Sequence, residues 1–156
     1  MAERAIQRIS PLDLRRNVAI GVPFPLGGTP IFSSTFSTQE QAISNLKCLL
    51  LTRKGERPFQ PLFGTDIPSF LFEQITDKLL NGLRDTISED IKFWLPYITM
   101  KDITVTKDED RHTVFFTFSF SVGESNANEI IILEISEQGG LSVSYTHLTL
   151  PTTYHV

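Results

Sequence analysis

The chain has 156 residues, of which 40% are hydrophobic and 21% charged, the composition of a single globular domain with a sizeable core. The formal net charge of −4 gives no overall attraction to nucleic acid or anionic lipid, and no apolar run approaches the roughly 18 residues of a membrane span. A single cysteine, Cys48, excludes an internal disulfide framework, and the first residues carry charges in place of an apolar signal core. We therefore expect a protein made in the cytoplasm, with neither nucleic acid nor membrane as a partner.

The N-terminal part is expected to contain an arm, a strand and a loop. Residues 1–16 mix four arginines with two acidic residues, which is typical of an arm that becomes ordered only against a partner. In residues 17–24 apolar and other side chains alternate, which predicts a half-buried strand that joins the sheet: Val18, Ile20, Val22 and Phe24. Residues 25–36 contain two glycines and two prolines and predict a loop.

The first predicted helix begins after Ser37. Ser37 and Glu40 have the spacing of a capping box, in which the hydroxyl accepts a hydrogen bond from the backbone N–H three residues on. One apolar stripe then follows at helical spacing: Ala42, Ile43, Leu46, Leu49 and Leu50. We expect this helix to end at Gly55 with a positive φ, and to carry Arg53 and Lys54 in its last turn, where cations meet the negative end of the helix dipole.

A second helix is predicted over residues 76–94. Thr76 is the expected N-cap, and Pro96 cannot continue the helix. Its apolar side chains repeat every three or four residues and define the buried stripe: Leu79, Leu80, Leu83, Ile87, Ile91 and Trp94.

Three strands follow the second helix. The first, over residues 98–106, changes its alternation near Lys101 and Asp102, which predicts a β-bulge. A charged hairpin, residues 107–111, leads to the second strand, 113–122, and the third covers 129–136. The predicted fold class is α+β: two main helices packed on one face of a small, largely antiparallel sheet of three to four strands.

The C-terminal tail, residues 138–156, contains no Asp, Glu, Lys or Arg, which is a sharp change from the rest of the chain. Threonine and valine favour a strand there, whereas Pro151 opposes one. Two interpretations stay open. The string SYTHLTLPTTYHV resembles translated sequencing-adaptor read-through, in which case the tail is not native, or the tail is a genuine arm that pairs with another subunit.

The stretch between the two helices contains prolines that hold it in a stiff loop. It includes LTRKGERPF at residues 51–59, PLFG at 61–64 and LFE at 71–73. These motifs at this spacing resemble the gene 25-like, or W-like, baseplate-wedge family of contractile phage tails and related injection machines. A looser similarity extends from about Asn17 to Ser136, and we expect residues 17–137 to form the single baseplate-wedge domain.

The resemblance implies a structural role without enzymatic activity. The subunit would lie in the baseplate of the virion tail, be assembled in the host cytoplasm, and template or anchor the first sheath ring by strand addition. Its implied partners are other baseplate wedge subunits, the tail sheath protein and the tail tube or hub. A bacterial secretion machine fits the same resemblance as well as a phage does.

The candidate site residues come from the same resemblance. The family-motif loop contains the residues expected to buttress the fold or contact a partner: Arg53, Gly55, Glu56, Arg57, Pro58, Phe59, Phe63 and Gly64. The family's second signature, Glu-Pro-Arg, helps to attach the subunit to the wedge core. Here Leu95, Pro96 and Tyr97 stand in its place, so Pro96 and Tyr97 are the candidate wedge contact and the two charges are absent.

The competing function is a peptidoglycan-degrading, lysozyme-like enzyme of the tail. Such an enzyme needs two carboxyl groups about 5 to 10 Å apart across a sugar cleft, and the candidates near the loop are Glu56, Asp66 and Glu73. The alternative role of Glu56 is to pair locally and cap loop N–H groups. The histidines lack metal-ligand spacing, and the basic residues of the loop are interrupted by Glu56, so we expect no catalytic, cofactor or metal residue and no nucleic-acid site.

Overall fold

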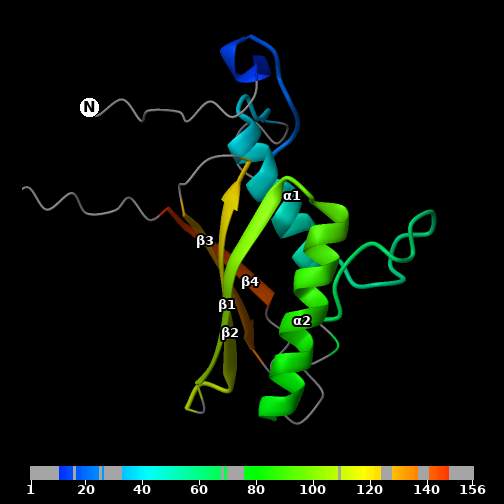
Figure 1. Cartoon of the computed structure of the whole chain (residues 1–156), viewed down its shortest axis with the longest axis vertical. Helices are drawn as coiled ribbons and strands as arrows, with labels where there is room; N and C mark the ends of the chain where they lie inside the picture. Colours follow the sequence, from blue (N-terminus) through cyan, green and yellow to red (C-terminus); the bar gives the residue numbers. More distant parts are fainter. Residues whose placement is uncertain are drawn as a thin grey trace, which may run out of the picture.

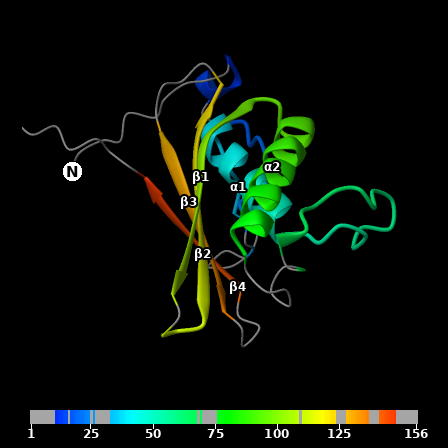
Figure 2. The ribbon, with the colours of Figure 1, turned by 60° about the horizontal axis from the view of Figure 1, so that its bottom comes forward.

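The computed structural model describes residues 11–15, 17–24, 26, 33–67, 69, 76–108, 110–123, 128–136 and 141–147. In these residues two helices, α1 and α2, cover one face of a four-stranded antiparallel sheet with the strand order β1-β2-β3-β4, as the two views of the ribbon show (Figures 1 and 2). The predicted α+β class is thereby confirmed. The predictions for residues 1–10, for the LFE triplet at 71–73 and for residues 148–156 lie outside the described part.

Helix α1, Thr38–Leu51, begins as its sequence predicts but ends earlier. The Ser37 hydroxyl accepts a hydrogen bond from the Glu40 N–H at 3.2 Å, and Leu46, Leu49 and Leu50 are fully buried. The helix stops at Leu51 because Thr52 adopts an extended conformation and its hydroxyl donates to the Cys48 carbonyl at 2.6 Å. The prediction that Arg53 and Lys54 lie in the last turn is therefore wrong.

Helix α2, Asp77–Trp94, matches its prediction closely. Leu83, Ile87 and Ile91 are buried, while Leu79, Leu80 and Trp94 are half-buried. Thr76 occupies the N-cap position, but its side chain makes no capping hydrogen bond. No helix in the described part of the chain has the length and apolar character needed to cross a membrane.

The sheet consists of β1 (Ile98–Asp108), β2 (Thr113–Val122), β3 (Glu129–Ser136) and β4 (Leu141–His147). The pairing of β1 with β2 shifts between Met100 and Asp102, which confirms the predicted bulge. The core side of β2 carries the predicted apolar series, all of it buried: Val114, Phe116, Phe118, Phe120 and Val122. Lys107 belongs to β1 and not to the hairpin loop, because it is paired with Val114.

Two segments differ from their predictions at the edges of the sheet. Residues 17–24 make a single bridge, Gly21 with Thr35, and do not join the sheet. Pro23 and Pro25 lack the N–H that a ladder requires, so this stretch cannot continue pairing. The fourth strand, β4, comes instead from the uncharged tail and pairs with β3. In this pairing Leu141 lies opposite Ile135, and His147 lies opposite Glu129.

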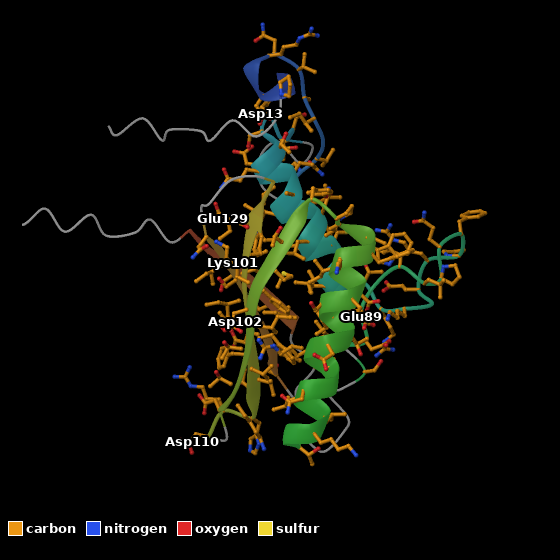
Figure 3. All side chains as sticks on the ribbon, in the orientation of Figure 1. Asp13, Glu89, Lys101, Asp102, Asp110 and Glu129 are labelled. Atoms are coloured by element: carbon orange, nitrogen blue, oxygen red, sulfur yellow. The ribbon has the colours of Figure 1, made fainter. Side chains whose placement is uncertain are left out.

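The described part of the N-terminal arm holds the start of α1. Pro11–Leu14 forms a short 3-10 helix, η1, from which Asp13 lies beside the first turn of α1 (Figure 3). The Asp13 carboxylate accepts hydrogen bonds from both the N–H and the hydroxyl of Thr38, each at 2.8 Å. The Thr38 N–H is one of the helix donors that have no partner inside the helix, and a carboxylate also suits the positive end of the helix dipole.

Replacing Asp13 with alanine is expected to lower the free energy of unfolding by about 1 to 2 kcal/mol, because the Thr38 N–H loses its acceptor. Urea denaturation followed by circular dichroism measures the change. Asp13→Asn is the matched control, since it keeps an acceptor oxygen and removes only the charge, and it should retain a large part of the stability. Equal stability of Asp13→Ala and the parent would show that water replaces this cap without loss.

Candidate functional site

The family-motif loop leaves the body of the protein and returns to it at one point. Arg53 and Thr65 form a parallel bridge, and the Thr65 N–H donates to the Thr52 carbonyl at 2.9 Å. The Thr65 hydroxyl donates to the Leu50 carbonyl at 3.0 Å, and Thr65 is fully buried. The two ends of the loop are thus fixed to the end of α1, as in a compact Ω-loop.

Hydrogen bonds inside the loop fix its shape. The Gly55 N–H donates across the loop to the Pro61 carbonyl at 2.7 Å, and Gly55 has the positive φ predicted from the sequence, +88°. The Glu56 carboxylate accepts from the Arg53 N–H at 3.0 Å, and the Phe63 N–H donates to the Gln60 carbonyl at 3.0 Å. Glu56 therefore caps a loop N–H.

Arg57 connects the loop to the core through its side chain. Its guanidinium carbon lies 3.9 Å from the centroid of the Phe63 ring, and Nη2 lies 3.2 Å from Sγ of Cys48 on α1. The Phe63 ring packs edge-to-face on Trp94 of α2, with 5.2 Å between the centroids. Trp94 contacts Phe93 in the same way at 5.1 Å. A continuous series of planar groups thus joins the loop to the end of α2.

Lys54 forms the ionic part of this connection. Its ammonium lies 2.7 Å from Oδ2 of Asp90 on α2 and 3.7 Å from Oδ2 of Asp66. Because Lys54 and Arg57 both have partners within the protein, two of the three loop cations do not form an open phosphate site. The prolines and aromatics of the sequence predict a stiff loop. They do not predict that residues of α2 contact and support this loop.

The tip of the loop stands away from the body of the protein (Figure 1). Phe59 is 98% exposed and Leu62 is 74% exposed. Phe93, at the neighbouring end of α2, is 75% exposed. Phe59 therefore does not pack inward, whereas Phe63 does contact the core.

The second predicted contact, Pro96 and Tyr97, lies in the turn between α2 and β1. Both residues are exposed, and the Tyr97 hydroxyl accepts a hydrogen bond from the Asn45 side chain at 2.8 Å. The Tyr97 carbonyl accepts from the Gly123 N–H at 2.9 Å. The structure therefore places this turn and the motif loop at the same end of α2, since Trp94 contacts Phe63 three residues before Tyr97.

The carboxylates considered for catalysis have local partners. Glu56 binds the Arg53 N–H, Asp66 lies near Lys54, and Glu73 is outside the described residues. Within the residues that the structure describes, no group of three His, Cys, Asp or Glu side chains could hold a metal ion. The groove described next contains neither Glu56 nor Asp66.

A groove of about 400 Å³ lies between α2 and β1, away from the loop. Its lining comes from one helix and one strand: Leu80, Asn81, Arg84, Asp102, Ile103, Thr104 and Val105. Successive side chains of a strand point to opposite faces, so four consecutive lining residues show that the groove contains the edge of β1. Arg84 and Asp102 form an exposed ion pair of 2.8 Å across it, and Figure 3 shows Lys101 and Asp102 on this strand.

The free edge of β1 was not anticipated. Residues 17–24, which the sequence predicts to join the sheet, are outside it, and residues 130–135 lie in β3, between β2 and β4. Among the described strands, β1 pairs only with β2, so its other side has no strand partner. The change of alternation near Lys101 and Asp102 is the sequence signal that could have indicated an edge strand, because β-bulges are common at sheet edges.

These features define an α+β protein with a loop supported by α2 and a strand edge that is open among the described strands. Residues 37–127, more than half of the chain, match the family described as baseplate wedge protein gp25, and the chain belongs to this family. The resemblance drawn from the loop motifs is thereby confirmed.

Individual relatives agree with this assignment. Baseplate wedge protein gp25 of Enterobacteria phage T4 is 32% identical over 79 residues, which cover 51% of this chain and about 60% of the phage protein's length. A chain of the anti-feeding prophage baseplate has 26% identity and a TM-score of 0.58, over 67% of this chain and 86% of that one. A Geobacter sulfurreducens protein provisionally described as a tail lysozyme has 21% identity and a TM-score of 0.59, over 67% and 95%, and shows the fold alone.

Proposed function

We propose that this protein is a structural subunit of the baseplate of a contractile tail, where it anchors the first ring of the sheath by accepting a strand at the edge of β1. Family membership supports the baseplate role. The proposed sheath contact rests on one observation: the edge of β1 has no strand partner among the described strands and lines the groove beside α2. In this proposal the protein acts in the virion by binding, without a catalytic step, after assembly in the host cytoplasm.

Strand addition suits this edge for two reasons. The edge of β1 presents backbone N–H and C=O groups that an extended sheath segment can pair with. On the side of the groove that faces α2, the half-buried side chains of Leu80 and Val105 provide an apolar surface for alternate side chains of the added strand, next to the buried Ile103. The backbone bonds would supply affinity and the apolar surface would fix the register.

The ion pair across the groove does not oppose this binding strongly. Arg84 and Asp102 are each about half exposed, and pairs of this kind contribute little to stability. Their separation on entry of a strand therefore costs little, and both charges can reorient toward solvent or the new strand. The other proposed partners, further wedge subunits and the tail tube or hub, would use surfaces away from this groove.

The lysozyme-like alternative has no observation in its favour. The similarity to the Geobacter sulfurreducens protein is at 21% identity and carries only the fold. Glu56 is exposed and hydrogen-bonded within its own loop, and it does not line the groove between α2 and β1.

Backbone hydrogen exchange tests the sheath contact. We expect purified sheath protein of the same tail to slow exchange at residues 102–105 of β1, because their outward groups become paired. Residues 130–135, which are already paired on both sides within the sheet, serve as the internal control and should not change. Protection confined to residues 53–63, with β1 unaffected, would refute strand addition and leave a docking contact through the loop.

A further inference from the structure

The tip of the motif loop, residues 58–62, is an uncharged apolar projection. Its sequence is Pro-Phe-Gln-Pro-Leu, and all five residues are exposed. Isolated apolar side chains are common on protein surfaces, so exposure alone means little. Here, however, Phe59 and Leu62 are both strongly exposed and belong to one loop, whose ribbon projects from the protein (Figure 1).

The base of the loop holds this tip outward in one conformation. The hydrogen bond from Gly55 to the Pro61 carbonyl closes the loop directly below the tip, and the bridge of Arg53 with Thr65 closes it again at the body. Pro58 and Pro61 restrict the backbone of the tip itself. A segment ordered before binding loses less conformational entropy when it binds, so this geometry favours recognition over simple solvent exposure.

The size of the tip indicates what kind of contact it makes. An aromatic side chain buries roughly 150 to 250 Å², so Phe59 and Leu62 together remain well below the ~800 Å² per partner of a stable interface. The tip alone therefore cannot hold two copies of this chain together. It fits the role of an anchor inside a larger interface, and Phe93 and Tyr97 at the same end of α2 offer exposed surface to continue it.

We infer that Phe59, supported by Leu62, inserts into an uncharged apolar pocket of a neighbouring baseplate protein and anchors that contact. The inference rests on the proposed baseplate function and names a site separate from the sheath contact at β1. The pocket must be apolar because residues 58–62 carry no charge, and the adjacent cations Lys54 and Arg57 already have partners within the protein. Central aromatic anchors of this kind dominate the affinity of many protein interfaces.

Binding of the purified subunit to a reconstituted baseplate wedge that lacks it tests the inference. Phe59→Ala is expected to weaken binding at least tenfold, whereas Phe59→Leu, which keeps an apolar side chain, should stay within about threefold of the parent. Gln60→Ala, on the same tip, is the matched control and should bind as the parent does. All three variants should have the melting temperature of the parent, because residues 59 and 60 are exposed. Weaker binding by Phe59→Ala would then not be caused by unfolding.

Sheath binding separates this inference from the proposed function. In Phe59→Ala, sheath protein should still slow hydrogen exchange in β1. If this variant also binds the wedge as tightly as the parent does, the anchor role of Phe59 is wrong and the proposed sheath contact is unaffected. Failure of the parent to bind either the wedge or the sheath protein would overturn both. Phe59-dependent binding to phosphatidylethanolamine–phosphatidylglycerol vesicles, or Phe59-dependent dimerisation in sedimentation, would also overturn the inference, in favour of a membrane or of a second copy.

Discussion

Replacing Gly64 with alanine is expected to lower the free energy of unfolding by about 3 kcal/mol or more. Gly64 has a φ of +122°, and an added Cβ would lie 2.4 Å from the Thr52 carbonyl oxygen and 2.9 Å from the Arg53 carbonyl carbon. Both obstacles are backbone atoms, and the Thr65 hydrogen bonds to Thr52 and Leu50 fix the chains on either side. The loop cannot make room without breaking its attachment to α1.

Gly55→Ala is the matched control for this substitution. Gly55 also has a positive φ, +88°, but its added Cβ would meet no atom within 4 Å, so only the backbone strain of about 1 kcal/mol remains. Urea denaturation of the two variants and the parent measures both losses. Equal losses would show that backbone conformation, and not the close approach to Thr52, determines the cost at Gly64.

The substitution Phe118→Ala should destabilise the protein by about 3 to 5 kcal/mol, because it removes the side chain at the centre of the core. Phe118 is fully buried, is paired with Ile103 of β1 and Ile131 of β3, and stacks on Phe116 with 6.4 Å between the centroids. Neighbours on three sides limit how far the cavity can collapse. The change is measured from the thermal and urea unfolding transitions.

Phe115→Ala provides the comparison on the other face of the same strand. Phe115 is only half-buried, and it points away from the side that the helices cover. We expect it to cost about 1 to 2 kcal/mol, clearly less than Phe118→Ala. If the two substitutions cost the same, the outer face of the sheet must be as fully packed as the core.

The elements that depend on local patterns were predictable from the sequence. The alternation in β2 and the four-residue spacing of Leu83, Ile87 and Ile91 in α2 follow from the periods of strand and helix. Ser37 and Glu40 mark the start of α1. The bulge was visible because the alternation of β1 changes phase.

The remaining features depend on residues far apart in the chain. Asp13 caps α1 from 25 residues away, and no local pattern joins it to Thr38. The alternation in residues 17–24 resembles a strand, yet Pro23 and Pro25 lack the N–H groups that a ladder requires, and the segment stays outside the sheet. For the candidate site, the sequence indicates the stiff loop and Gly55, but the exposure of Phe59 and the closeness of Gly64 to Thr52 depend on how the loop meets α1 and α2.

The connection of α2 to its neighbours has a mechanical consequence. The motif loop is attached near the C-terminal end of this helix, through Lys54–Asp90 and Phe63–Trp94, and the groove with β1 lies about 15 Å away, toward its N-terminal end. The turn into β1 is tight, with the Ile98 N–H bonded to the Leu95 carbonyl at 2.9 Å. A pull on the edge of β1 would therefore be transmitted along α2 to the loop, where the Lys54–Asp90 ion pair and the edge-to-face rings of Phe63 and Trp94 hold the loop to the helix.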